Sequence, residues 1–227
     1  MEYQTYFSKK VALVNVVLTF LIVLLHATPN MRYGIEVDMN YPFIYCATVL
    51  CQIGVPMFFF LSALLFYKVC ERSDLKRKLK SRVHSLLVPY LLWNVIFFVI
   101  YFVITRIPFI ESRMHMGEIP DNWLSICVGI IDSRFTPLWF VRNLLIYVAF
   151  SPILYFLLKN RNVALVCLIA FFSIAISVEW SSYHPILWLP IYFTGAVWGK
   201  YFEKGRLYAI YGWDAVFLFA CLLAYVV

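Results

Sequence analysis

A stripe of polar side chains runs along one face of the first apolar stretch of the sequence. Asn15, Thr19 and His26 are four and seven residues apart, which places them on one side of a helix whose other positions are mostly Val, Leu, Ile and Phe. An ionisable group inside an apolar helix is costly and usually faces the interior of a bundle. We therefore expect His26 to face the interior of the bundle and to serve a function there. In the alternative, the stripe only hydrogen-bonds a neighbouring helix.

Arg142 is a second ionisable side chain inside an apolar stretch. It lies about four residues into its stretch, and His26 lies about two residues from the end of its own, so we expect the two at one depth. A base near an arginine is suited to deprotonating a hydroxyl and stabilising the oxyanion that develops. The alternative is an arginine whose side chain reaches the outer lipid headgroups.

A run of basic residues leads directly into the third apolar stretch. Such a run could bind a phosphate-rich ligand, and it could equally be a loop that sets topology and contacts anionic lipid. Polar residues in other stretches could line a path leading inward from His26: Asn15, Gln52, Ser62 and Asn94. The basic run itself consists of Lys76, Arg77, Lys78, Lys80 and Arg82.

The composition limits what kind of protein must position these residues. Apolar residues make up 63% of the 227 residues, against about 45–50% in a soluble domain, and charged residues make up 14%, against about 25%. A membrane protein with basic inner loops explains the net charge of +7, so we expect no nucleic-acid partner. The six cysteines form no C-x-x-C pair and have no histidine at a metal-ligand spacing, so we expect no metal.

Apolar stretches of about 20 residues, separated by short polar loops, predict an all-α bundle of seven membrane spans. Of the 19 lysines and arginines, 14 fall on the side of the N-terminus, which the positive-inside rule makes cytoplasmic. The first stretch could instead be a signal peptide, but His26 and the absence of an A-x-A site argue against cleavage. The predicted spans are 11–28, 41–67, 87–105, 138–158, 163–179, 185–201 and 208–227.

Two further segments carry local signals. The stretch 106–137 faces outward in this topology, and we expect its apolar part, 126–131, to lie along the membrane interface or to re-enter the membrane. Gly195 and Gly199 are four residues apart on one predicted helix, which indicates close packing against another helix rather than chemistry.

The order of the segments resembles the membrane-bound acyltransferase family 3. The resemblance rests on VLTFLIVLLHA, IGVPMFFFLSALLFYK, KLKSRVHSLLVPYLLWN, PLWFVRNLLIYVAFSP and LPIYFTGAVWGKYF, which follow one another along nearly the whole chain. It identifies His26 with the family's motif histidine and Lys80 and Arg82 with its basic pair. The family's Trp-Phe with a following arginine corresponds to Trp139, Phe140 and Arg142.

The sequence also departs from the family pattern. Asn15 stands where many members have an arginine or lysine, eleven residues before the histidine. This chain therefore lacks the positive charge that would contact the donor at that position. Members usually have about ten helices in this domain. We therefore expect residues 1–227 to form a single acyltransferase domain that is incomplete at its C-terminus.

The resemblance implies transfer of an acyl group, usually acetyl from acetyl-CoA, to a hydroxyl of a carbohydrate or envelope glycan at the cell membrane. We expect no tightly bound cofactor, with His26 and Arg142 catalytic and Trp139 on the acceptor side. Donor binding is expected at Lys80, Arg82, Asn15, Ser62 and Asn94. The alternatives are a transporter or flippase whose polar stripe lines a path, and a non-catalytic membrane subunit.

Overall fold

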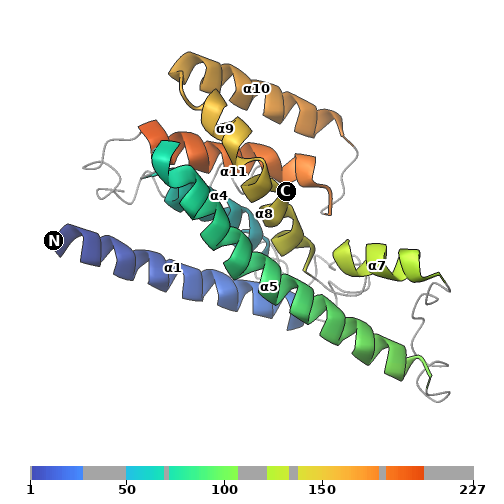
Figure 1. The fold of residues 1–227 in the computed structure, drawn as a ribbon. Coiled ribbons are helices and arrows are strands. Elements are labelled where there is room, and N and C mark those ends of the chain that lie inside the picture. Colours follow the sequence, from blue (N-terminus) through green and yellow to red (C-terminus); the bar gives the residue numbers. More distant parts are fainter. Residues whose placement is uncertain are drawn as a thin grey trace, which may run out of the picture. The chain divides into compact units, whose positions relative to one another are not determined.

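The computed structural model describes residues 2–27, 50–68, 72–106, 122–132, 138–178 and 183–201. Within these ranges the chain is helical and contains no strand (Figure 1), which confirms the all-α prediction. The predicted span 208–227 and the first part of the span 41–67 lie outside the described residues. The helices are α1 (Glu2–Ala27), α4 (Gly54–Tyr67), α5 (Arg72–Ile104), α7 (Trp123–Ile131), α8 (Trp139–Ala149), α9 (Ser151–Leu157), α10 (Arg161–Ser177) and α11 (Pro185–Tyr201).

Two helices of the described part are long and apolar enough to cross a membrane, Leu50–Tyr67 and Asp74–Ile104. A third crossing results if α8 and α9, which meet at an angle of 59°, form one bent span. These helices support a membrane protein. The number of seven spans and the cytoplasmic N-terminus remain predictions.

The bend between α8 and α9 differs from the single helix expected over 138–158. Phe150 interrupts the helix, and Pro152 follows two residues later. Proline has no N–H to donate to the carbonyl one turn earlier, and its ring crowds that carbonyl. The turn at Phe150 therefore separates two helices of different direction.

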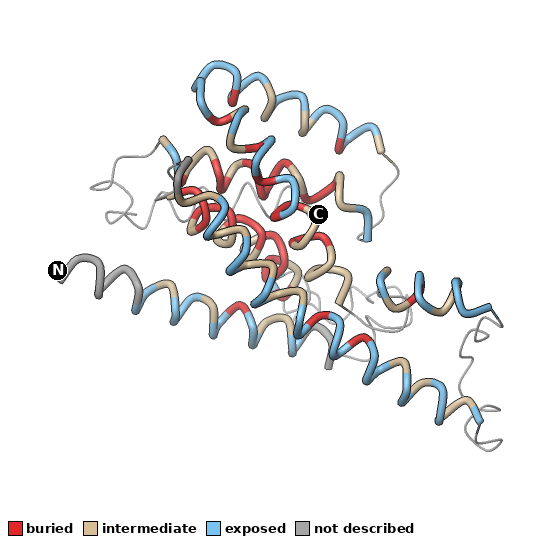
Figure 2. The backbone as a smooth tube through the Cα atoms, in the orientation of Figure 1, coloured by how far each residue is buried: buried red, intermediate tan, exposed pale blue. Residues whose placement is uncertain are grey.

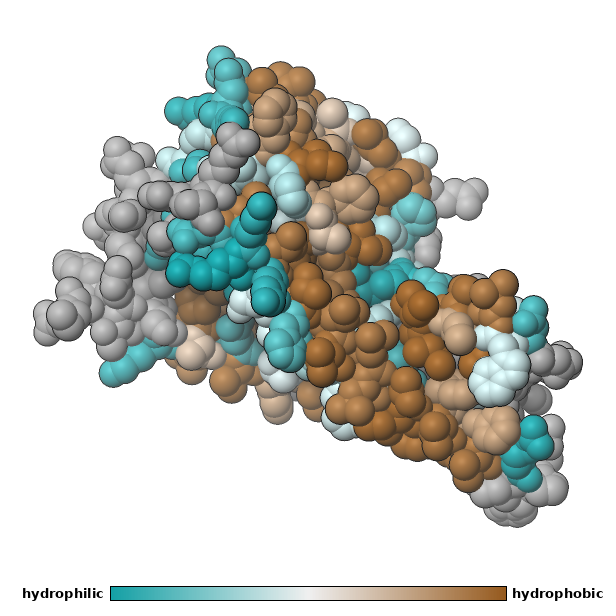
Figure 3. Space-filling model, viewed as in Figure 1, coloured by the Kyte–Doolittle hydropathy of each residue, from teal (hydrophilic) through white to brown (hydrophobic). Residues whose placement is uncertain are grey.

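The helix α5 is longer than the predicted span 87–105, because it begins at Arg72 and includes the basic run. Residues 72–86 contain no glycine or proline and are rich in Lys, Arg and Leu, which are good helix formers. Asp74 in the first turn forms an ion pair of 2.8 Å with Arg77 and complements the helix dipole. Figure 3 shows the result as a change from hydrophilic to hydrophobic surface along α5.

The chain divides into two compact units. Unit 1 contains α1, α4, most of α10 and most of α11. Unit 2 contains α5, α7, α8, α9 and residues 183–187, which include the start of α11.

Unit 1 is held together by a close approach of α4 and α11. A Cβ atom on Gly195 would lie 2.2 Å from the Phe60 carbonyl oxygen, and one on Gly199 would lie 2.6 Å from that of Leu64. Only glycine fits at these positions, so the prediction that this glycine pair packs helices is confirmed. Aromatic pairs flank the contact, with ring centroids 5.8 Å apart for Phe59 and Trp188 and 6.2 Å apart for Phe60 and Trp198.

Unit 2 is built around α5, which packs against α7 and α8. Tyr90 donates its hydroxyl to the carbonyl of Ile131, the last residue of α7, and Asn94 is fully buried one turn further along α5. The helix α7 begins with an N-cap from Asn122 and lies beside α5 (Figure 1). Most other residues of the apolar part of α5 are exposed, as expected for a helix that faces lipid (Figure 2).

Candidate functional site

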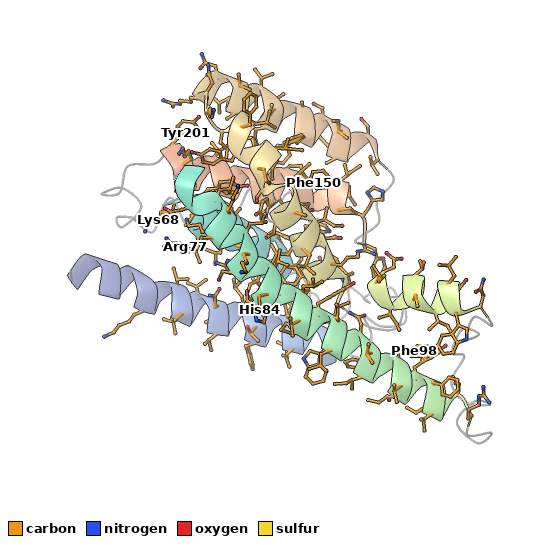
Figure 4. All side chains as sticks on the ribbon, in the orientation of Figure 1. Lys68, Arg77, His84, Phe98, Phe150 and Tyr201 are labelled. Atoms are coloured by element: carbon orange, nitrogen blue, oxygen red, sulfur yellow. The ribbon has the colours of Figure 1, made fainter. Side chains whose placement is uncertain are left out.

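An open groove of about 720 Å³ lies along the N-terminal half of α5. Figure 4 labels Arg77 and His84, two of the residues along it. The described residues of its wall recur at three- and four-residue spacings, which is one face of a helix. They are Arg77, Lys80, Ser81, His84, Ser85, Val88 and Pro89.

The groove changes character along its length. Arg77 and Lys80 supply positive charge at one end, the hydroxyls of Ser81 and Ser85 follow, and apolar Val88 closes the other end. The ion pair of Arg77 with Asp74 is weak, because the Arg77 side chain is 81% exposed. A ligand anion such as a phosphate can therefore replace Asp74 as the partner of Arg77. The volume falls in the range of small-molecule sites. The groove therefore suits an elongated ligand with phosphates at one end and an apolar arm.

The structure separates two of the residues expected to bind a donor together. Lys80 lines the groove, whereas Arg82 is half-buried and does not. Residues two positions apart on a helix point about 160° away from each other, so Lys80 and Arg82 stand on different faces of α5. Asn94 is also absent from the groove, because it is fully buried and donates its amide to the Tyr90 carbonyl at 2.8 Å.

The remaining predicted residues of the polar path belong to unit 1. Asn15 on α1 and Ser62 on α4 are both half-buried. The hydroxyl of Thr19 donates to the Asn15 carbonyl at 2.8 Å, so this hydroxyl is satisfied within its own helix. A Cβ atom on Gly54 would lie 3.0 Å from the Cγ1 atom of Ile22, which shows that the stripe borders the contact with α4.

His26 stands on α1 one helical turn after the contact of Ile22 with α4. Its side chain lies outside the described residues. The role of His26 as a general base therefore remains a prediction from the sequence.

Arg142 on α8 donates hydrogen bonds through all three of its nitrogen atoms. Its Nη1 donates to the Asp132 carbonyl at 3.0 Å and forms an ion pair with the Asp132 carboxylate. Its Nη2 donates to the Tyr183 carbonyl at 2.5 Å and to Oδ1 of Asn143 at 3.3 Å, and its Nε donates to the same Oδ1 at 3.3 Å. A guanidinium has five N–H groups, so these contacts occupy all of them.

Protein groups enclose the Arg142 side chain. It is only 17% exposed and ends on protein acceptors. It joins the end of α7 at Asp132, the first half of α8 and the segment before α11 at Tyr183. We name Asp132, Arg142, Asn143 and Tyr183 the Arg142 cluster.

A hydrogen bond from α5 holds the end of α7 from which Asp132 continues. Asp132 follows Ile131, whose carbonyl accepts the Tyr90 hydroxyl, and Tyr90 directly follows Pro89 of the groove wall. The Tyr90 hydrogen bond therefore ties the end of α7, next to Asp132, to the part of α5 that follows the groove wall.

A second row of α8 residues holds the segment 183–185. Trp139 and Tyr183 form an edge-to-face pair with centroids 5.9 Å apart, Asn143 donates to the Tyr183 carbonyl at 3.4 Å, and Tyr147 donates to the Pro185 carbonyl. Sequence reasoning identified Trp139 but missed Asn143 and Tyr147. Their spacing of four residues on one face was the available signal.

In the described part of the chain, no three His, Cys, Asp or Glu side chains gather as a metal site would require.

Comparisons with known proteins point to a family and to a relative. The model of the family Acyl_transf_3, described as an acyltransferase domain, matches residues 12–227. Over 178 residues the chain is 27% identical to the succinoglycan biosynthesis protein ExoH of Rhizobium meliloti (strain 1021). The alignment covers 72% of this chain and 47% of that protein, so the chain spans about half the length of this curated relative. No solved structure matches the chain significantly.

Proposed function

The chain belongs to the Acyl_transf_3 family of acyltransferase domains, and on this basis we propose that it is a cell-membrane O-acetyltransferase with acetyl-CoA as donor and a glycan hydroxyl as acceptor. The helices that are long and apolar enough to span a membrane support the location. The name of the relative, which concerns the biosynthesis of a glycan, supports a carbohydrate acceptor of the cell envelope.

The α5 groove is the observation that carries the donor assignment. Coenzyme A combines phosphate groups with a long arm that ends in the thioester, and the groove runs from Arg77 and Lys80 to an apolar end at Pro89. Phosphates bind at the cationic end through charge-assisted hydrogen bonds. The thioester then lies toward the apolar end of the groove at Val88 and Pro89. We retain Lys80 as a donor ligand and add Arg77, whereas Arg82, Asn15, Ser62 and Asn94 are not among the residues that line the groove.

The proposed reaction is a direct acyl transfer. A glycan hydroxyl loses its proton to His26, and its oxygen attacks the thioester carbonyl carbon. The new C–O ester bond forms as the C–S bond breaks, and the thiolate of coenzyme A leaves and takes up a proton. The negative charge that develops on the carbonyl oxygen requires hydrogen-bond donors or a nearby positive charge.

In this proposal Trp139 keeps its expected place on the acceptor side, and Arg142 keeps a catalytic role that the structure refines. All five N–H groups of Arg142 already have protein acceptors, so its contribution to an oxyanion is its positive charge rather than an unused donor. Its larger effect is to fix the position of the chain segments that meet at Asp132 and Tyr183.

The test of the function is the O-acetyl ester content of the host's envelope glycans. Cells express the native chain, His26→Ala, Thr19→Ala or an empty vector at equal membrane abundance. Thr19→Ala is the matched control, because it removes a polar group from the same helix whose hydroxyl is satisfied within α1. We expect esters with the native chain and Thr19→Ala, and none with His26→Ala. Equal ester content in all four would overturn the proposal.

A second assay separates an acetyltransferase from a transporter or a non-catalytic subunit. Membranes that contain the protein are supplied with acetyl-CoA and de-esterified envelope glycan, and free coenzyme A is measured. Release that depends on the glycan is expected of a transferase. A conduit or a structural subunit releases no coenzyme A.

A further inference from the structure

We propose that Tyr183 and His184, with Trp139 behind them, form a binding platform for one sugar ring of the acceptor glycan. The three residues are named the acceptor platform. This inference rests on the proposed function, since it identifies where the carbohydrate of that reaction binds. Neither Tyr183 nor His184 takes part in the proposed acyl transfer itself.

The backbone of the acceptor platform is fixed by buried side chains of α8. Arg142 and Asn143 both donate to the Tyr183 carbonyl, and Tyr147 donates to the Pro185 carbonyl. Asn143 is fully buried and Tyr147 nearly so, which makes these anchors costly to break. The His184 carbonyl accepts the Leu187 N–H at 3.2 Å in the first turn of α11.

The residues on this fixed backbone are exposed. Tyr183 is 59% exposed even though its edge-to-face contact with Trp139 sets the orientation of its ring. His184 beside it is exposed as well. A sugar ring presents C–H faces that pack on aromatic rings and hydroxyls that hydrogen-bond an imidazole. A preorganised ring next to a polar group therefore matches a saccharide, because little conformational entropy is lost on binding.

The predicted topology places the acceptor platform where an envelope glycan would be. The segments that Arg142 joins are the loop containing Asp132, the start of α8 and residues 183–185. The positive-inside rule assigns all three to the outer side. Their direct contact is what a shared side of the membrane requires, and the basic α5 groove belongs to the opposite, inner side in the same scheme.

Kinetics on the full-length chain in membranes test the inference. Tyr183→Ala is expected to raise the KM for the acceptor about tenfold, and His184→Ala somewhat less, with the KM for acetyl-CoA unchanged. The anchors bind backbone carbonyls, so these substitutions leave them in place. Tyr183→Phe keeps the ring and is expected to raise the acceptor KM less than Tyr183→Ala does. Trp123→Ala, which removes an exposed aromatic residue of α7, is the matched control with no change.

Direct binding keeps this test independent of catalysis. The probe is de-esterified oligosaccharide released from the host's envelope glycan, titrated into the purified full chain and its Tyr183→Ala variant. If the oligosaccharide binds Tyr183→Ala more weakly than Trp123→Ala, the platform is supported. If no acetyl transfer is found in the same experiments, only the proposed function fails. Acetyl transfer with an unchanged acceptor KM in Tyr183→Ala overturns the platform and leaves the function standing. A third outcome would also overturn the platform. If both Tyr183→Ala and Trp123→Ala lower the membrane abundance equally and leave the acceptor KM unchanged, these aromatic residues anchor the protein to lipid instead.

Discussion

The two helices that are long and apolar enough to cross a membrane differ sharply in how much of their surface the protein covers. In the span Leu50–Tyr67, which contains α4, 61% of the residues are buried, whereas in the apolar part of α5 only 11% are buried. The difference reflects their partners. α4 meets the backbone of α11 across two glycines, and α5 contacts α7 and α8 along a narrow strip around Tyr90.

This contrast indicates where ligands can bind. A helix whose faces are filled by other helices contributes stability and has no surface left for a ligand. α5 keeps one face for the groove and leaves much of the rest of its apolar part to lipid. We therefore expect substitutions in the α4–α11 contact to act on stability and substitutions in the α5 groove to act on the donor.

The largest expected effect comes from filling the α4–α11 contact. Gly195→Ala places a Cβ atom 2.2 Å from the Phe60 carbonyl oxygen, which is backbone and cannot move aside. The helices must separate, at a cost of about 3 kcal/mol in the free energy of unfolding. Thermal unfolding of the purified protein in detergent measures this loss.

Gly54→Ala is the matched control for that prediction. Its Cβ atom would lie 3.0 Å from the Ile22 side chain, which can change rotamer. We expect less than about 1 kcal/mol of destabilisation. Equal stability of the two variants would show that α4 and α11 can separate slightly without cost, so that their contact does not determine stability.

A smaller loss of stability is expected when the Arg142 cluster is broken. Arg142→Ala removes five hydrogen bonds and leaves the Asp132 carboxylate without this partner. The Asp132 side chain is 46% exposed and regains water, so the cost is about 2 kcal/mol rather than that of a fully buried pair. Arg142→Lys should not restore stability, because an ammonium cannot reach three segments at once.

Arg106→Ala serves as the control in the same unfolding measurement. Arg106 is exposed and lies 4.7 Å from the Phe102 ring centroid. Its loss should cost less than about 1 kcal/mol. If Arg142→Ala is no less stable than Arg106→Ala, Arg142 does not hold the cluster together, and a purely catalytic role becomes the better interpretation.

Substitutions in the α5 groove should weaken donor binding and leave stability unchanged. Lys80→Ala removes a cation from the exposed groove wall and should leave the unfolding temperature unchanged, while the KM for acetyl-CoA rises about tenfold. Lys76→Ala removes an exposed cation of the same helix that does not line the groove, and its KM should stay at the native value. A similar rise in both variants would indicate a general effect of charge rather than a binding site.

The smallest expected effect concerns the ion pair at the start of the groove. Asp74→Asn releases Arg77 from its 2.8 Å contact, and the exposed guanidinium becomes available to a phosphate. The KM for acetyl-CoA should fall by less than about threefold, with stability changed by less than about 0.5 kcal/mol. A rise in the KM would mean that Asp74 orients Arg77 for the donor.

Much of the fold could be predicted because its signals are local. The apolar stretches mark the helices, and the spacing of Gly195 and Gly199 marks their contact. The bend at Phe150 and the early start of α5 were missed. Both had a local signal, Pro152 in the first case and a breaker-free run of helix-forming residues in the second.

The candidate site could be predicted only in part, because it depends on contacts between distant segments. The family resemblance selected Lys80 and Arg82 from the basic run. The partner of Lys80 on the groove face is Arg77, which follows only once the run is known to be helical. The acceptors of Arg142 lie ten residues before it and 41 residues after it. No periodicity within one helix predicts such a contact.

Photo-crosslinking with a coenzyme A analogue that carries a photoreactive acyl group would locate the donor on the protein. The full chain in membranes is irradiated with the analogue, and labelled peptides are identified by mass spectrometry. We expect label on α5 between Arg77 and Tyr90, removed by excess acetyl-CoA and by the Arg77→Ala, Lys80→Ala double variant. Label that survives in the double variant, or that falls outside α5 and the Arg142 cluster, would contradict donor binding in the α5 groove.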